Sequence, residues 1–341
     1  MKFLGYDCSV GVIGIAIALA CSACSSNTPD VSAIRQSESI KTDAARDVTV
    51  LTSQLDSDRE ATPGSDRHGQ TAPSETIQVG VLVIDSAVSV HQRYSPLLQY
   101  LSDTTGYSFT LVPLFQTSQF EAAAADSLHF ILSNPLASVK LQQRYGTTFI
   151  ATQVRPQTGS KFGGLIIVRQ DSSIQSLDDL SGKRVACVNF QTAAAGCVFQ
   201  IYHLQQQGIE PQTDFAQFIE IPSQDNIILA VLNGTIDAGF VRSGQLEQTS
   251  AKGLIDSTDA IRVLEPASDN FFYPHTTPLY PEWPMSALKH TDPAIAEAVA
   301  EALLNLPANH PSLSSAGLIG FVPASDYTSV SQLIEALDLP Y

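Results

Sequence analysis

The segment 162–200 constrains the fold more than any other part of this sequence, because it places two buried strands before the start of a helix. The run 162–168 is apolar, ends in three β-branched residues and is too short for a helix, which indicates a strand buried on both faces. A helical turn over 174–183 leads to a second apolar strand at 184–188. Helical composition then runs over 193–207, so the segment predicts an α/β domain.

The predicted helix at 193–207 begins with a turn that can meet a small anion. Thr192 is the expected N-cap, which leaves the amides of Ala193 and the next two residues pointing out of the helix start. The partial positive charge of a helix N-terminus favours an oxyanion at this place. Gln191, directly before the cap, belongs to the same candidate site. A plain helix cap without a ligand explains these residues equally well.

The same alternation continues over the rest of the body, residues 76–341. Further strands are expected at 77–83, 107–112, 128–132 and 235–241, and further helices at 93–101, 121–126, 136–145, 226–232 and 293–306. Pro96 falls near the start of the first of these helices, where proline is tolerated. Strands that alternate with helices at these spacings imply parallel βαβ units, whose ligands lie beyond the carboxyl ends of the strands.

The order of these elements fits two α/β lobes with a cleft between them. We expect lobe 1 at about 76–160 and 268–341, and lobe 2 at about 168–264. The chain would cross between the lobes twice, near 159–164 and near 266–272.

The N-terminal part of the sequence predicts export. Lys2 precedes an apolar run at 10–20 that is too short to span a bilayer permanently. The residues before Cys21 resemble a bacterial lipobox, so 1–24 is expected to be a lipoprotein signal peptide with Cys21 lipidated. The alternative is an ordinary signal peptide with an incidental cysteine.

Residues 25–75 are rich in Ser, Thr, Asp, Gln and Pro, which predicts a disordered polar tether.

These segments place the protein on the periplasmic or extracytoplasmic face of the cell envelope, held to the membrane only by an N-terminal lipid. A formal net charge of -16 argues against nucleic acid as a partner, because a duplex binder needs Lys and Arg to displace counterions. A small anion remains a suitable ligand, since a few focused donors in a cleft outweigh a repulsive average.

The sequence lacks the short motifs that carry most enzyme chemistry. It has no nucleophile elbow, no H-E-x-x-H, no glycine-rich phosphate loop with Lys and no Cys/His cluster with zinc spacing. We therefore expect no catalytic residue, no metal and no cofactor. A hydrolase or transferase on the same scaffold is a third hypothesis, which turnover of a candidate ligand would reveal.

Cys187 and Cys197 are the two cysteines of the folded body. One lies at a strand end and the other early in the next helix, and an exported protein meets an oxidising compartment. A disulfide beside the anion site and two free buried thiols both stay open, because the sequence does not supply the Cα separation that a disulfide requires.

Polar side chains at the ends of predicted strands form the core of the candidate site. Arg242 ranks first, because a guanidinium just past a strand end can donate to two anionic oxygens at once. Its alternative role is a surface salt bridge, and Ser243 follows it directly. Ser133 and Asn134 hold the corresponding position in the first lobe, where a helix cap competes with ligand contact.

Four more residues are candidates at the edges of the cleft. Arg93 and Tyr94 begin a helix and either close the cleft or cover the helix end. His275 lies at the second crossing, where the role of a donor competes with that of an ordinary buried histidine. Phe162, at the first crossing, is a candidate for packing against the ligand.

The succession of segments over 76–341 resembles the phosphonate-binding (PhnD-like) branch of periplasmic solute-binding proteins. Its most specific pieces are 126–135, 162–189, 231–242 and L-Y-P-E-W-P at 279–284. The last piece is more similar to the sensory domains of tetrathionate-type histidine kinases. The resemblance implies a type II periplasmic binding fold, in which each lobe is a mainly parallel sheet flanked by helices.

One departure from the family concerns the ligand. Phosphonate binders usually place a Ser/Thr-rich turn where this chain has Q-T-A-A-A-G at 191–196, so hydroxyl donors are scarce while backbone amides remain. A sulfur oxyanion thus rivals phosphonate, phosphite and phosphate.

The resemblance implies a protein that captures a small oxyanion for the permease of an ABC importer. In the alternative, it passes the binding event to a membrane sensor kinase of a two-component system.

Overall fold

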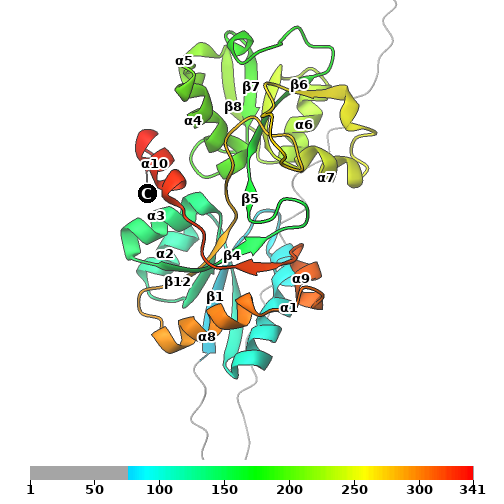
Figure 1. Cartoon of the computed structure of the whole chain (residues 1–341). Helices are drawn as coiled ribbons and strands as arrows, with labels where there is room; N and C mark the ends of the chain where they lie inside the picture. Colours follow the sequence, from blue (N-terminus) through cyan, green and yellow to red (C-terminus); the bar gives the residue numbers. More distant parts are fainter. Residues whose placement is uncertain (1–75, 341) are drawn as a thin grey trace, which may run out of the picture. The chain divides into compact units, whose positions relative to one another are not determined.

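The computed structural model describes residues 76–340 of the chain (Figure 1). The predicted signal peptide, the predicted lipidation site Cys21 and the predicted tether at 25–75 lie outside the described residues. Within the described part, none of the helices combines the length and apolar character that a membrane span requires.

The first lobe is built on a six-stranded sheet in the order β13-β4-β12-β3-β1-β2. Its strands are β1 (Thr76–Leu82), β2 (Ser108–Leu114), β3 (Phe130–Leu132), β4 (Thr148–Val154), β12 (Pro284–Ala287) and β13 (Gly320–Val322). β1 pairs in parallel with β2 and β3, whereas β12 and β13 add antiparallel pairs. The sheet is therefore mixed, and the expected parallel pairing holds for its β3-β1-β2 part.

Helices cover both faces of this sheet (Figure 1). They are α1 (Ala87–Thr105), α2 (Ser118–Ala124), α3 (Pro135–Tyr145), α8 (Pro293–Leu304) and α9 (Pro311–Ala316). Phe130 and Leu132 of β3 pack into the core shared with α1, α8 and α9, and Ile131 packs into the core shared with α2 and α3. Because successive strand residues face opposite sides, a strand covered on both faces needs a continuous apolar run.

Helix α1 begins earlier than the sequence indicated. The Ser86 hydroxyl accepts a hydrogen bond from the Ser89 amide at 3.1 Å and caps the helix, which runs to Gly106 in a left-handed conformation. Pro96 therefore lies inside the helix rather than near its start. The first turn reads A-V-S-V at 87–90, and its two valines are two residues apart, a spacing that does not indicate a helix.

The second lobe is built on a five-stranded sheet in the order β10-β6-β9-β7-β8. Its strands are β6 (Gly164–Arg169), β7 (Arg184–Cys187), β8 (Gln217–Glu220), β9 (Ala238–Arg242) and β10 (Ile261–Val263), and its helices are α4 (Phe199–Gln206), α5 (Pro211–Asp214), α6 (Gln224–Leu232) and α7 (Gln245–Ala251). β7 pairs in parallel with β8 and β9, and β6 and β10 are antiparallel, so this sheet is mixed as well. Leu165 and Ile167 of β6 face one core, and Ile166 and Val168 face the other.

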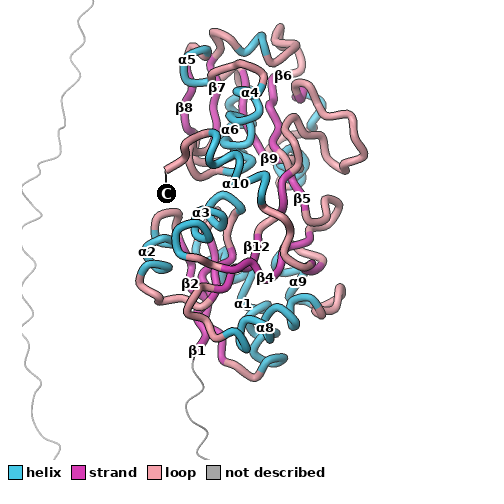
Figure 2. The backbone as a smooth tube through the Cα atoms, turned by 60° about the vertical axis from the view of Figure 1, so that its left-hand side comes forward, coloured by secondary structure: helices cyan, strands magenta, loops and turns pink. Residues whose placement is uncertain are grey.

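Two short strands connect the sheets. β5 (Lys161–Phe162) leads toward the second sheet (Figure 2), and it pairs with β11 (Tyr280–Pro281) on the return path. The amides of Thr276 and Thr277 still donate to the carbonyl of Gly164 in the second sheet, at 2.8 and 3.1 Å. The return crossing therefore lies later in the chain than the expected 266–272.

Helix α10 (Thr328–Ala336) packs against α3 of the first lobe and α4 of the second. Leu333 and Ile334 of α10 belong to one buried cluster with Val139 of α3 and Phe199 of α4. This cluster joins helices of the two lobes through apolar side chains.

Candidate functional site

Three charged side chains meet near the paired crossing strands. Arg242, at the end of β9, donates from Nη2 to Oε1 of Glu282. Arg155, directly after β4, donates from Nε to the same oxygen at 3.0 Å. The Glu282 side chain has 0% of its surface exposed, and its Oε2 has no hydrogen-bond partner among the described residues. Two guanidinium groups, one from each sheet, thus converge on one buried carboxylate oxygen.

Arg242 is held in place by more than its ion pair. Its guanidinium lies 4.8 Å from the centroid of the Phe162 ring, a cation–π contact. Burial lowers the pKa of Arg242 to about 10, opposed by the charge of Glu282 and reinforced by those of Arg155 and Arg93. The group therefore remains charged at neutral pH.

Arg93 and Tyr94 connect to this group through one amide side chain. Gln153 accepts from Arg155 Nη2 at 3.4 Å and donates to the Tyr94 hydroxyl, also at 3.4 Å. The Arg93 guanidinium lies 5.4 Å from the Tyr94 ring centroid and donates to the carbonyl of Ala316 at 3.1 Å. Arg93 and Tyr94 therefore lie in the first lobe, and Tyr94 is linked to Arg155 through Gln153.

The predicted cap at Thr192 is wrong. A π-helical turn at Ala194–Val198 precedes α4, and Ala193 holds the N-cap position with an extended backbone and no side-chain cap. The side chain of Asn189 accepts from the Thr192 hydroxyl at 2.7 Å and from the amides of Gln191 and Thr192. Asn189 thus forms a side-chain turn that uses the groups expected to cap the helix. The first-turn amides that an anion could meet begin after Ala193.

Cys187 and Cys197 are joined in a disulfide, with sulfurs 1.96 Å apart and Cα atoms 5.1 Å apart. Cys187 ends β7 and Cys197 lies in the π-helical turn. The Val188 amide also donates to the Gly196 carbonyl at 3.0 Å. One covalent and one hydrogen bond therefore fix the helix start against the strand before it.

Asn134 links the first lobe to this helix start. Its Oδ1 accepts from the Ala137 amide at 3.0 Å and caps α3, while its Nδ2 donates to the Thr192 carbonyl at 3.3 Å. The neighbouring Ser133 hydroxyl is buried and donates to Oε1 of Gln119 at 2.5 Å. Asn134 thus combines the cap with a contact to the opposite lobe, and Ser133 is engaged within its own lobe.

Two candidates have structural partners. The Ser243 hydroxyl accepts from the Gly163 amide at 3.1 Å and so ties the end of β9 to the first crossing. His275 is buried, with Nδ1 2.7 Å from the Thr277 carbonyl and Nε2 3.0 Å from Oδ2 of Asp269. Both ring nitrogens are occupied, which fits an ordinary buried histidine.

The sequence interpretation missed Arg155, Glu282 and Lys140. Glu282 is the acidic residue of the L-Y-P-E-W-P piece, and its position among Pro and aromatic residues was the available signal. The Lys140 ammonium is buried on α3, and it donates to the Pro340 carbonyl at 2.8 Å and the Gln191 carbonyl at 3.5 Å. Burial lowers the pKa of Lys140.

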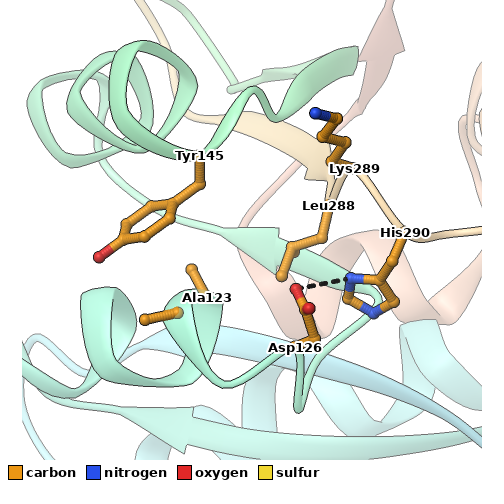
Figure 3. A pocket seen from close by; sticks show the side chains of 7 residues that line it. Ala123, Asp126, Tyr145, Leu288, Lys289 and His290 are labelled. Atoms are coloured by element: carbon orange, nitrogen blue, oxygen red, sulfur yellow. Dashed lines mark ion pairs between the residues drawn. The ribbon is translucent and has the colours of Figure 1, made fainter.

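A separate pocket of about 510 Å³ lies on the first lobe (Figure 3). His290 and Asp126 form an ion pair at its edge, with 3.2 Å between Nδ1 and Oδ1. Its lining is Ala123, Ala124, Asp126, Tyr145, Leu288, Lys289 and His290. None of the predicted ligand-binding residues belongs to it.

A family model described as the periplasmic substrate-binding protein of a phosphonate ABC transporter matches residues 79–328. The chain belongs to this family. Periplasmic substrate-binding proteins bind solutes outside the cytoplasm and are not enzymes. The mixed sheets flanked by helices are those of their type II fold.

The chain is also similar to a sensor histidine kinase. The chain is 29% identical over 239 residues to the tetrathionate sensor histidine kinase TtrS of Salmonella typhimurium, a match that covers 68% of this chain and 40% of that protein. The chain thus spans well under half the length of this relative. The similarity agrees with the expected likeness to tetrathionate-type sensory domains.

Solved structures share the fold of this substrate-binding protein. PhnD1 of Prochlorococcus marinus in complex with methylphosphonate matches with a TM-score of 0.62 and 17% identity, covering 78% of this chain and 99% of that one. XAC2383 of Xanthomonas citri bound to ATP matches with a TM-score of 0.65 and 18% identity, over 78% of this chain and 99% of that one.

Proposed function

We propose that this chain captures a small oxyanion in the cleft between its lobes, at 76–160 with 268–341 and at 168–264, for an ABC importer. The ligand class is phosphonate, phosphite, phosphate or a sulfur oxyanion. The observation that carries the proposal is the convergence of Arg242 and Arg155, from opposite sheets, on one buried carboxylate oxygen. Guanidinium groups bind tetrahedral oxyanions through paired hydrogen bonds, as they bind carboxylates.

The helix start on the second lobe supplies a second set of donors in this proposal. The amides after Ala193 lie next to the Thr192 carbonyl that Asn134 contacts from the first lobe. Backbone amides bind oxyanions without any hydroxyl side chain, which suits a turn rich in alanine. The complexes of PhnD1 with methylphosphonate and of XAC2383 with ATP are consistent with oxyanion ligands on this fold. The proposal includes an N-terminal lipid on Cys21 that holds the protein to the membrane.

The second candidate function is a sensory one, and the similarity to TtrS favours it. The same binding event would then be passed to a membrane histidine kinase rather than a permease. Co-purification of the ligand-loaded protein with either partner from membranes distinguishes the two.

Calorimetry with phosphate, phosphite, methylphosphonate, sulfate, thiosulfate and tetrathionate tests the proposal. A ligand at one hundred times its dissociation constant stabilises the native state by about 2.7 kcal/mol, which a thermal-unfolding shift also reports. Arg242→Gln is expected to abolish binding, because it removes the charged donor on the second lobe. The matched control is Arg184→Gln, at the opposite end of the second sheet, where Arg184 pairs with Asp237 at 2.7 Å.

The control is expected to bind like the wild type. Circular dichroism verifies that each variant is folded before its affinity is compared. Wild-type affinity in folded Arg242→Gln would refute the proposed site, and the absence of binding for all six anions would refute the ligand class.

A further inference from the structure

We propose that the Glu282 carboxylate is an internal anion that occupies the Arg242 guanidinium until a ligand takes its place, and that it selects ligand head groups with a single negative charge. This inference rests on the proposed function and specifies the ligand class of the same site. It concerns a residue whose carboxylate is wholly buried between two arginines.

The main chain fixes Glu282 beside the crossing strands. It follows β11, its amide donates to the Ser160 carbonyl at 2.9 Å, and its carbonyl accepts from the Tyr327 hydroxyl at 2.6 Å. The Tyr327 hydroxyl also lies 3.0 Å from the Thr152 hydroxyl. The main-chain contacts thus hold the carboxylate between Arg155 and Arg242, and none of its surface is exposed to solvent.

The geometry permits an exchange of partners without an unpaired buried charge. Breaking a buried ion pair is costly mainly because it strands one charge. If an oxyanion takes Arg242, Arg155 still donates to Glu282 Oε1 at 3.0 Å, and the ligand neutralises Arg242. Each guanidinium then has one anionic partner.

The charges of the three residues determine the preferred ligand. Two guanidinium groups and one carboxylate leave one positive charge, which an anion with one negative charge balances. Arg93 lies over the Tyr94 ring and donates to a backbone carbonyl, so its charge acts on Arg242 without pairing with Glu282. A second negative charge on the ligand would remain unbalanced and repel Glu282 in a weakly screened site.

The experiment compares two tetrahedral sulfur anions whose charges do not change near neutral pH, methanesulfonate and sulfate. Calorimetry on the full chain is expected to show tighter binding of methanesulfonate. Glu282→Gln keeps the shape and an acceptor oxygen but removes the charge. It is expected to raise the affinity for sulfate about tenfold more than the affinity for methanesulfonate.

The double variant Arg155→Gln/Glu282→Gln removes one positive and one negative charge together and leaves Arg242 as the one charged residue of the three, so it serves if the single variant does not fold. It is expected to bind both anions more tightly than the wild type, because the internal anion no longer occupies Arg242, and to keep the wild-type preference, because the net charge of the three positions is unchanged. A fall in affinity for both anions would mean that Glu282 only orients Arg242, and it would overturn the inference. Unchanged affinities, or binding of neither anion by wild type and variants, would overturn it too.

The outcomes separate this inference from the proposed function. Arg242→Gln is expected to bind neither anion. If it binds like the wild type, the proposed site itself fails. If it loses binding while Glu282→Gln leaves the selectivity unchanged, the site stands and the internal anion is refuted.

Discussion

Loss of the Cys187–Cys197 disulfide is expected to lower the free energy of unfolding by about 2.7 kcal/mol. The cysteines are 10 residues apart in the sequence, and the loop-closure entropy of a loop of this length gives that value at 25 °C. Both residues are fully buried in the core of the second lobe, so reduced thiols still pack there. The native state is thus expected to survive reduction with a lower stability.

Urea unfolding followed by far-UV circular dichroism, with and without reductant, measures this difference. Thiol titration of the unfolded protein establishes that reduction is complete. In thermal unfolding, the same loss corresponds to a fall in Tm of about 5 to 10 °C for a domain of this size. The variant Cys187→Ala/Cys197→Ala, measured without reductant, is the matched test, because it removes the cross-link in another way.

Equal unfolding midpoints for oxidised and reduced protein would refute this reasoning. Oxyanion binding is expected to weaken but persist after reduction, because the Val188 amide still holds the Gly196 carbonyl. Complete loss of binding in a folded, reduced protein would show that the hydrogen bond alone does not keep the helix start in place.

Two further predictions concern single polar contacts. Hydrogen bonds from the Arg184 side chain lower the pKa of Asp237, so this pair stabilises the fold above about pH 4 and the contribution is lost as the pH falls through the lower native pKa. Because Arg184 is 42% exposed, Asp237→Asn is expected to cost only about 0.5 to 1 kcal/mol at pH 7 and less at pH 2, and an equal cost at both values would contradict this. Asn134→Ala is expected to cost about 1 kcal/mol through the lost cap of α3, whereas Asn134→Ser keeps the cap and loses only the contact to the Thr192 carbonyl. Chemical denaturation of both variants tests the cap, and equal stability of the two would exclude it.

The strands could be predicted because their signal is local. Alternate residues of β6 face different cores, namely Leu165 and Ile167 on one side and Ile166 and Val168 on the other. A strand that is buried on both sides needs a continuous apolar run, which can be recognised in the sequence. The helix start at 193–207 was harder. Its composition fits a helix, but the Asn189 side chain takes the Thr192 hydroxyl, and the first turn is π-helical. Amino-acid composition shows neither the hydrogen-bond partner of the Thr192 hydroxyl nor the π-helical form of the first turn.

The candidate site was predictable only where a residue's place on a strand reveals it. Arg242 follows β9, and the carboxyl end of a strand is a recognisable position. Arg155 and Glu282 are 127 residues apart, and Glu282 is 40 residues from Arg242. Hydrophobic periodicity describes neighbours along the chain, so it cannot show that these three side chains meet.

The ladder between β5 and β11 has a mechanical consequence. Because the two connecting strands are hydrogen-bonded to each other, they turn as one ribbon, and the sheets cannot swivel on each connection independently. Phe162, which carries the Arg242 guanidinium on its ring, belongs to this ribbon, and Glu282 directly follows it. Atoms near a pivot travel least for a given rotation. Opening of the molecule would therefore widen the route for solvent and solute while the central arginine and glutamate stay nearly in register.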